Sequence, residues 1–479
     1  MSDSESDDSF VEPSAKRLKK GAGGEGQATA PMSFVSWNAN GLVSRCSWNK
    51  DDLHRLLRET HNPDVLCLQE VRLKAAGPAN RGTPLASDYA SVKDVMERSV
   101  FSDYQPFWSL HDNKYAGTLT LIHKRLAFDA NNSNCAFTTR SALSLLLKKY
   151  HLTRQDIGIS NNNNNIPKRL DSPKKKKQTS MTAFFAPKAT AATTSPNKKS
   201  SVLSDEHHSE GRFQFFSFSN FDLINTYVPN NGTKEESYQR RREWDHDMKA
   251  FLASRRKLLE KAAEASKMTN NNNKSQDNDH QDNATTTTTN IAERPLLWCG
   301  DLNVAADYRD GSHWKRGTID NDTEDEIFEF WTDEKQCFVA GVTKRLDPNR
   351  HSDDKGIPSF TTNERRRFAE IRREADLADT WRELHPDGCS STDDDNAKYK
   401  SPWDRPNFTW RGHLSKDGNT YASKYQGKGQ RLDYFLLSPS SLVKDVVLEC
   451  SILGYGEKRE GLFCGSDHCA TILKLKKPF

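Results

Sequence analysis

Short apolar runs that each end in an acid or an amide limit the folds open to this chain more than any other feature. MSFVSWNANGL (32–42), PDVLCLQE (63–70) and PLLWCGDLN (295–303) are such runs. Each is long enough for a buried strand and shorter than most helices. The segment 51–61 lies between the first two runs and has leucines at helical spacing. A strand, a helix and a second strand in this order predict a layered α/β fold.

Further secondary structure is predicted along the rest of the chain. The segments 213–219 and 221–230 are two apolar runs that we expect to pair as a hairpin. A long charged helix is predicted at 237–265. Additional strands are predicted at 117–124, 431–438 and 468–476. We interpret these elements as parts of one domain that spans 32–479.

Two polar tracts interrupt this pattern, at about 155–210 and about 267–292. Neither can bury enough apolar surface to offset the ~1–2 kcal/mol per residue that ordering a backbone costs. We therefore predict that both are disordered insertions within the domain. Residues 1–31 are acidic, then basic, then rich in glycine and alanine, which predicts a disordered N-terminal arm.

Composition excludes several classes of protein. No run approaches 18 consecutive apolar residues, so no membrane span is expected. The formal net charge is only +4, so a nucleic-acid partner would require a local basic surface. The 9 cysteines are scattered without a CxxC pair, which is typical of reduced thiols and argues against a structural zinc site.

The residues at the predicted strand ends can perform hydrolytic chemistry together. Acid and amide oxygens suit a hard cation such as Mg²⁺, a carboxylate can activate water, and a histidine beside an aspartate can stabilise a phosphate oxygen. Any one of these residues alone is more simply a turn former. Their joint occurrence points to metal-assisted hydrolysis of a phosphate ester. The residues are Asn38, Asn40, Glu70, Asp301, Asn303, Asp433 and the triplet Ser466, Asp467 and His468.

The sequence resembles the exonuclease III / apurinic endonuclease family, within the endonuclease–exonuclease–phosphatase superfamily. The resemblance covers about 32–479 apart from the two insertions. It implies a four-layered α/β sandwich, in which two mixed β-sheets pack face to face and helices cover the outside. The blocks that carry the resemblance are SWNANGL (36–42), DVLCLQE (64–70), TYVPN (226–230), CGDLNVA (299–305), RLDYFLLS (431–438) and GSDHC (465–469).

The resemblance implies a role for each strand-end residue. Asp301 would orient or deprotonate the attacking water, and His468, oriented by Asp433, would contact the scissile phosphate. The water and the phosphate would also be contacted by Asn38, Asn303, Tyr227 and Asn230. Glu70 would be the principal Mg²⁺ ligand, with Mn²⁺ as a substitute. The wider metal-ligand set would be Asn40, Glu70, Asp301, Asn303, Asp467 and His468.

The same resemblance implies that the substrate is damaged double-stranded DNA, cleaved 5′ to an abasic site, with additional 3′-end processing. Phe408 and Trp410 match the aromatic side of a pocket for an extrahelical abasic sugar; the alternative is that both are core residues. Gln430 stands where some relatives carry a bulky tryptophan, so a wider pocket would favour 3′-end processing. Basic residues expected to grip phosphates are Arg72, Lys74, Arg365 and Arg366, although the two neighbouring arginines also fit a solvated helix face.

Two alternatives to an abasic-site endonuclease stay open at this point. One is an enzyme that is mainly a 3′–5′ exonuclease or 3′-phosphodiesterase with weak abasic-site cleavage. The other is an inactive repair scaffold bound to a sliding clamp. The complete set of acids and histidine argues against the scaffold, because a lapsed enzyme would be expected to have lost some of them.

The first polar tract contains an octapeptide, QTSMTAFF (178–185), whose apolar residues are out of place among lysines and serines. Its spacing resembles the motif by which repair proteins bind the sliding clamp, with Gln178, Met181, Phe184 and Phe185 as the contact residues. Alternatively, the aromatic pair docks onto the catalytic domain, or the pattern is accidental. The preceding PKRLDSPKKKK (167–177) resembles a bipartite nuclear import signal and predicts a nuclear location.

Overall fold

The computed structural model describes the elements that carry the predicted domain. Most of the N-terminal arm, the octapeptide that resembles a clamp-binding motif (178–185) and most of the two polar tracts lie outside the described residues. The predictions made for them therefore stay predictions. The described residues are 30–78, 80–126, 210–218, 220–273, 294–306, 308–311, 318–319, 326–332, 337–343, 358–386, 408–410, 429–453 and 463–479.

The first large sheet has 6 strands in the order β13-β14-β1-β2-β4-β3. Strands β1 and β2 are parallel, whereas the other neighbours are antiparallel, so the sheet is mixed. Its strands are β1 (Ser33–Asn38), β2 (Val65–Gln69), β3 (Tyr104–Ser109), β4 (Thr118–His123), β13 (Val447–Ile452) and β14 (Thr471–Leu475).

The second large sheet has 5 strands in the order β11-β12-β7-β6-β5. Strands β6 and β7 are its one parallel pair, so this sheet is also mixed. The antiparallel pairing of β5 with β6 confirms the predicted hairpin. Its strands are β5 (Phe213–Ser217), β6 (Asp222–Tyr227), β7 (Leu296–Asp301), β11 (Ala378–Asp379) and β12 (Asp433–Ser438).

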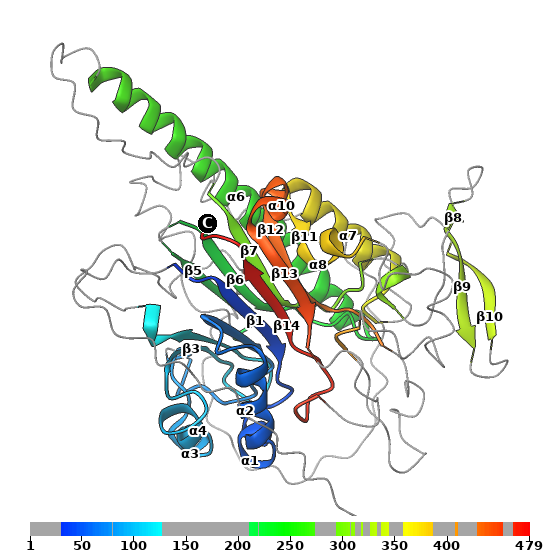
Figure 1. Cartoon of the computed structure of the whole chain (residues 1–479). Coiled ribbons are helices and arrows are strands. Elements are labelled where there is room, and N and C mark those ends of the chain that lie inside the picture. Colours follow the sequence, from blue (N-terminus) through cyan, green and yellow to red (C-terminus); the bar gives the residue numbers. More distant parts are fainter. Residues whose placement is uncertain are drawn as a thin grey trace, which may run out of the picture.

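A small antiparallel sheet, for which the sequence predicts no strands, lies to one side of the two large sheets (Figure 1). Its strands pair in the order β10-β9-β8. They are β8 (Thr318–Ile319), β9 (Glu326–Thr332) and β10 (Cys337–Thr343). In the sequence these strands follow β7, which ends at the predicted site residue Asp301.

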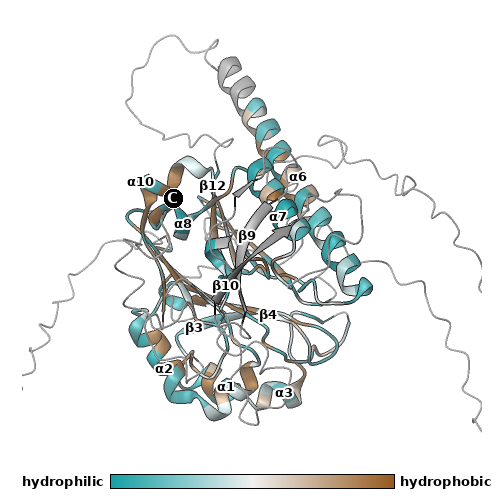
Figure 2. Cartoon of the chain, turned by 90° about the vertical axis from the view of Figure 1, so that its right-hand side faces the viewer, coloured by the Kyte–Doolittle hydropathy of each residue, from teal (hydrophilic) through white to brown (hydrophobic). Residues whose placement is uncertain are grey.

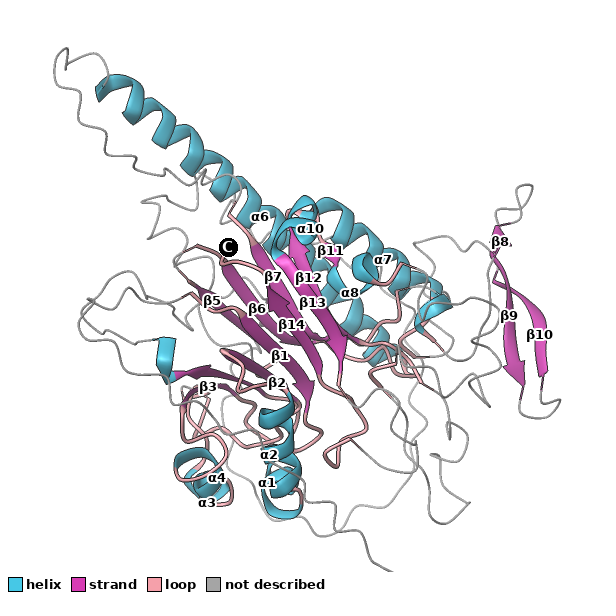
Figure 3. Cartoon of the chain, viewed as in Figure 1, coloured by secondary structure: helices cyan, strands magenta, loops and turns pink. Residues whose placement is uncertain are grey.

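Helices cover both outer faces of the paired sheets, which confirms the predicted four-layered sandwich (Figures 1 and 3). Over the first sheet lie α1 (Leu42–Trp48), α2 (Lys50–Glu59), α3 (Ala86–Ala90) and α4 (Lys93–Glu97). Over the second lie α6 (Glu235–Asn273) and α7 (Thr362–Glu374). Shorter helices are α8 (Thr380–Leu384), α10 (Val443–Val446), η1 (Lys124–Leu126), η4 (Tyr308–Asp310) and η8 (Ser440–Leu442).

Two apolar cores hold these layers together. One lies between the sheets and under α1 to α4, and includes Phe34 and Leu66 of the first sheet and Leu297 of the second. The other fills the space between the second sheet and the helices α6 and α7, with Trp298 packed near Phe251. Burial at about 25 cal/mol per Å² of apolar surface makes these interfaces the main source of stability.

Helix α6 is longer than the sequence predicts. Residues 267–273, assigned to the second polar tract, continue its helical backbone. Adding a residue to an existing helix costs little compared with nucleating one, so the polar residues can follow the packed part. Figure 2 shows hydrophilic residues along much of this helix. Within the described part of the chain, no helix has the length and apolarity needed to cross a bilayer.

Candidate active site

The predicted site residues meet at the carboxyl ends of the two parallel strand pairs. β1 and β2 end at one edge of the first sheet, and β6 and β7 end at one edge of the second. Because the sheets pack face to face, these edges adjoin. Asn38 Nδ2 donates to Asp301 Oδ2 at 2.9 Å, and Tyr227 OH donates to Glu70 Oε1 at 2.8 Å. Both hydrogen bonds therefore join one sheet to the other.

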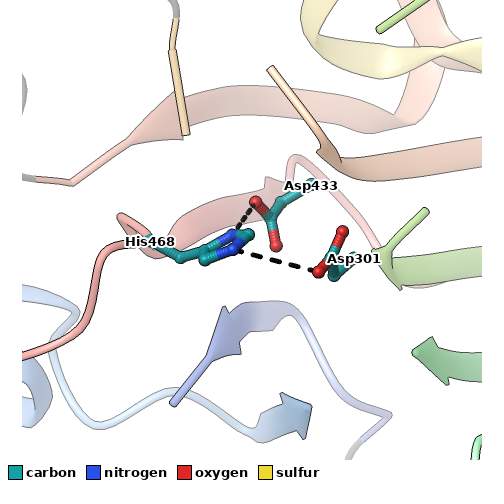
Figure 4. Close-up of side chains that lie close together, drawn as sticks. All are labelled: Asp301, Asp433 and His468. Carbon is teal, nitrogen blue, oxygen red and sulfur yellow. Dashed lines mark hydrogen bonds and ion pairs between the residues drawn. The ribbon is translucent and has the colours of Figure 1, made fainter. Parts of the chain in front are cut away.

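A buried cluster of Asp301, Asp433 and His468 forms the centre of the site (Figure 4). Asp433 lies directly opposite Asp301 in the β12–β7 pairing. His468 Nδ1 lies 2.8 Å from Asp433 Oδ2, and its Nε2 lies 3.9 Å from Asp301 Oδ2. A carboxylate only accepts hydrogen bonds, so Nδ1 carries a proton and Nε2 is directed toward Asp301.

The electrostatics of this cluster give the acid and the histidine different properties. Burial, together with the nearby Asp433 carboxylate, raises the pKa of Asp301 to about 7, although His468 and Asn38 oppose the shift. Burial alone would lower the pKa of His468, but Asp433 outweighs it and raises that pKa to about 10. At neutral pH the imidazole is therefore cationic, and Asp301 can accept a proton near the working pH.

Asparagines hold the Asp301 carboxylate in place. The backbone N–H of Asn303 donates to Asp301 Oδ1 at 2.9 Å, and its side-chain Nδ2 donates to Asp301 Oδ2 at 3.2 Å and to the carbonyl of Val228 at 2.9 Å. Asn230 Nδ2 donates to Asn303 Oδ1 at 2.9 Å and to Ser359 Oγ at 3.1 Å. Both asparagines are thus engaged with the protein.

A second polar group surrounds Glu70. Its Oε1 accepts from Tyr227 OH and from a terminal nitrogen of Arg72, each at 2.8 Å. Burial and the Glu70 carboxylate raise the pKa of Tyr227 well above its ordinary value, so the phenol stays protonated and donates. Glu70 and Arg72 both have φ 53, in the left-handed region that residues other than glycine rarely adopt. Such conformations concentrate at functional sites.

A third group links Asn40 to Asp467. Asn40 Nδ2 donates to Asp467 Oδ1 at 2.7 Å, and its backbone N–H donates to Asn38 Oδ1 at 2.9 Å. Trp410 Nε1 donates to the other oxygen, Asp467 Oδ2, at 3.2 Å. Asn40 has φ 46, again left-handed. The carboxylate of Asp467 is therefore fixed from two sides.

The segment 408–410 connects the loops that carry Asp433 and His468. Thr409 Oγ1 accepts from the backbone N–H groups of Leu432 at 2.9 Å and Asp433 at 3.1 Å, and its carbonyl accepts from Cys469 N at 2.7 Å. Neither pattern nor spacing in the sequence indicates this role of Thr409.

The two aromatic residues of this segment differ in their exposure to solvent, and so do the basic residues that were expected to grip phosphates. Phe408 is 1% exposed, as a core residue would be, whereas Trp410 is only partly buried and reaches Asp467. Arg72 and Lys74 are exposed. Arg365 and Arg366 are partly buried on α7, and the guanidinium of Arg365 lies 4.3 Å from the ring centroid of Phe360.

Arg212 is a further site residue that the sequence does not reveal. Its side chain is 1% exposed, and its guanidinium carbon lies 4.6 Å from the ring centroid of Tyr227. It donates to Tyr227 O at 3.1 Å and to Tyr115 OH at 2.7 Å. Arg212 therefore supports the ring whose hydroxyl contacts Glu70.

The donor set is suited to a cation. The carboxylates of Asp301 and Asp433 lie in one cluster with the His468 ring, with atoms of the three side chains within 4.8 Å of one another; the protonated ring itself offers no lone pair to a cation, so the carboxylates are the available ligands. Asp433 Oδ1 is buried and has no hydrogen-bond partner among the described residues, so an oxygen donor is available there. Glu70 adds a carboxylate directly after β2, and Asp467 adds one in the loop before β14. Oxygen-rich sets of this kind fit a hard divalent ion.

Comparison with known proteins agrees with the geometry. The model of the Endonuclease/Exonuclease/phosphatase family, whose nucleases are metal-dependent hydrolases, matches residues 35–468. A DNA-(apurinic or apyrimidinic site) endonuclease of Arabidopsis thaliana is 28% identical over 94% of this chain and 86% of its own length. A protein of the same name from Plasmodium falciparum (isolate 3D7) is 24% identical over 92% of this chain, which spans 54% of that longer relative.

Among solved structures, the AP endonuclease LMAP from Leishmania major aligns over 94% of this chain and 89% of its own, with 18% identity and a TM-score of 0.48. The family match extends from within β1 to His468 and so includes the whole central cluster. It confirms the resemblance that the sequence blocks indicate. The chain belongs to the endonuclease/exonuclease/phosphatase family.

Proposed function

We propose that this protein is a Mg²⁺-dependent DNA repair endonuclease that hydrolyses the phosphodiester 5′ to an abasic site. The observation that carries the proposal is the buried cluster of Asp301, Asp433 and His468, because it combines a base and a cation at the meeting point of two sheets. Its family hydrolyses phosphate esters, and the named relatives support DNA with abasic sites as the substrate.

The residues divide the reaction among them. Asp301, with a pKa near neutrality, takes a proton from the attacking water while Asn38 and Asn303 hold its carboxylate. His468 donates from Nε2 to a phosphate oxygen, and Asp433 stabilises the imidazolium. A fixed cation beside developing negative charge is worth more in a buried site than in water, because it needs no reorganisation during the reaction.

Glu70, Asn40 and Asp467 would hold the Mg²⁺ ion, for which Mn²⁺ can substitute. When bound, the ion supplies Lewis-acid stabilisation of charge on the phosphate and the leaving oxygen. Three side-chain hydrogen bonds orient the two carboxylates. Tyr227 donates to Glu70 Oε1, Trp410 donates to Asp467 Oδ2, and Asn40 donates to Asp467 Oδ1.

A nicking assay on an abasic duplex, with Mg²⁺ and with chelator, tests the proposal. Asp301→Asn and Glu70→Ala should each lower turnover by about 10²–10⁴-fold while the protein stays folded. Glu260→Gln, on an exposed part of α6, is the control and should cleave normally. Near-normal turnover by either site variant, or cleavage that ignores the chelator, would show that the assigned roles are wrong.

A second activity, 3′-end processing, is favoured by Gln430. This residue is 3% exposed and pairs with Trp410 through both backbone hydrogen bonds, so it borders the segment 408–410. A bulky side chain there would narrow the adjacent space. Gln430→Trp should lower the rate on a 3′-blocked nick relative to an abasic duplex. An unchanged ratio of the two rates would remove this argument for 3′-end processing.

We also propose that the chain acts in the nucleus and binds the sliding clamp through Gln178, Met181, Phe184 and Phe185. The motif spacing and its lysine-rich flank support this partner. Replacing Phe184 and Phe185 by alanine should abolish capture on immobilised clamp and leave the nicking of short duplexes intact. Loss of nicking would instead indicate that the pair docks onto the catalytic domain.

A further inference from the structure

Besides Asn38 of β1, which donates to Asp301 directly, two loops carry asparagines that support the Asp301 carboxylate. One follows β6 and carries Asn230, and the other follows β7 and carries Asn303. The two asparagines are joined by a hydrogen bond of 2.9 Å, and Asn303 in turn contacts the Asp301 carboxylate. The relative position of the two loops therefore determines how the Asn303 side of the Asp301 carboxylate is held.

Arg241 of α6 lies behind both loops and is bonded to each. Its side chain is 2% exposed. The two N–H groups of one terminal nitrogen, NH1, are shared among three backbone carbonyls, those of Pro229 at 3.1 Å, Leu302 at 3.2 Å and Asn303 at 3.0 Å. A buried carbonyl without a hydrogen-bond donor lowers the stability of the fold by about 1–3 kcal/mol. The Arg241 guanidinium supplies donors to the carbonyls at the point where the two loops meet.

The guanidinium is itself held in one orientation. Asp245 lies one turn further along α6. The Nε–H group of Arg241 is shared between its two carboxylate oxygens, at 2.9 Å from Oδ1 and 3.2 Å from Oδ2. Asp245 Oδ2 also accepts from Arg367 Nε of α7 at 2.7 Å. A planar guanidinium fixed by a carboxylate presents its remaining donors in one direction, which a lysine ammonium cannot reproduce.

Asn303 needs such support because of its backbone. Its φ of 48 lies in the left-handed region, which is costly for a residue other than glycine unless neighbouring contacts enforce it. The carbonyl that Arg241 binds belongs to this same residue. We propose that Arg241 is a positioning residue for phosphodiester cleavage: it fixes Asn303 and Asn230, and through them the Asp301 carboxylate. This inference rests on the proposed function.

The same helix offers a matched control. Arg255 of α6 is also buried and also bridges a carboxylate to backbone carbonyls, namely Asp222, Arg294 O at 3.0 Å and Pro295 O at 3.2 Å. Its contacts lie at the amino ends of β6 and β7, away from the chemistry. Substitution of Arg255 therefore reports what the loss of a buried arginine does to the fold alone.

The experiment compares Arg241→Lys with Arg255→Lys. Thermal unfolding, duplex binding in chelator, and kcat and KM on an abasic duplex are measured for both. Arg241→Lys should lower kcat about 10²-fold, as expected for a displaced catalytic group, with KM and duplex affinity within about twofold of wild type. Arg255→Lys should lower the unfolding temperature and leave kcat unchanged.

Three results would overturn the inference: a kcat of Arg241→Lys close to wild type, an effect confined to KM, or an equal loss of kcat in Arg255→Lys. Should Arg241→Lys not fold, Arg367→Gln removes the Nε–H group that anchors Asp245 Oδ2, and an unchanged kcat there would also overturn the inference. The variants are assayed in parallel on bis(p-nitrophenyl) phosphate. If wild type cleaves this diester but no abasic duplex, the proposed function is wrong. The values of kcat on the diester for Arg241→Lys and Arg255→Lys then still test the role of Arg241.

Discussion

Asp222 is the centre of a buried ion cluster at the opposite end of β6 from Tyr227, and its removal should separate stability from catalysis. Asp222 Oδ2 accepts from Arg255 Nε at 2.9 Å and NH2 at 2.7 Å, and its Oδ1 accepts from Arg294 Nε at 2.9 Å. Burial alone would raise the pKa of Asp222, but the two arginines outweigh it and lower the pKa.

Asp222→Asn would leave two buried guanidinium groups without their counter-charge. Breaking a buried ion pair costs about 3–5 kcal/mol, which corresponds to a fall in unfolding temperature on the order of 10 °C. Because the folded-state pKa of Asp222 is lowered, its stabilisation is present above the ordinary aspartate pKa of about 4 and is lost as the pH falls through the lower folded value. The difference between wild type and variant should therefore shrink below about pH 4.

Thermal unfolding at pH 7 and at pH 3.5, together with nicking assays at 20 °C, measures both properties. The six residues of β6 place Asp222 roughly 17 Å from Tyr227, at about 3.3 Å per residue, so kcat of the folded variant should match wild type. A variant as stable as wild type at pH 7 would refute the assigned role of the ion cluster. A large loss of kcat at 20 °C would refute the separation of the two strand ends.

Two other contacts give predictions of the same kind. Tyr227→Phe removes the 2.8 Å hydrogen bond to Glu70, worth about 1.5–3 kcal/mol because the acceptor is charged, so kcat on an abasic duplex should fall about 10–100-fold with duplex affinity unchanged. Thr409→Val leaves the N–H groups of Leu432 and Asp433 without their acceptor and should cost about 1–3 kcal/mol for each in urea unfolding, whereas Thr409→Ser should restore stability. Equal stability of the valine and serine variants would contradict the bracing role of Thr409.

The strands that carry the chemistry could be predicted because each is a buried apolar run that ends in polar residues. β1, β2, β6, β7, β12 and β14 fall within their predicted segments. β3 escapes this pattern because YQPFWS contains Pro106, which has no N–H for a ladder and counts against a strand. The structure places β3 at the edge of its sheet, where a proline is tolerated.

The supporting arginines could not be predicted from the sequence. QRRREWD (239–245) has the composition of a solvated helix face, yet Arg241 is buried. Whether a charged side chain faces water or backbone carbonyls depends on loops distant in sequence, here 61 and 62 positions away from Arg241. The acid and amide residues were found because their types alone carry chemical meaning, whereas an arginine in a charged helix has no such signature.

The division of the active site between two sheets affects how the enzyme must form. Asn38 and Asp301 are 263 positions apart, and Trp37 Nε1 donates to His468 O across 431 positions. Contacts this distant in sequence form slowly, because large loops must close before they do. Activity should therefore return last during refolding, after helical and strand signals have recovered. Either sheet folded without the other would contain half of the catalytic groups and no catalytic power.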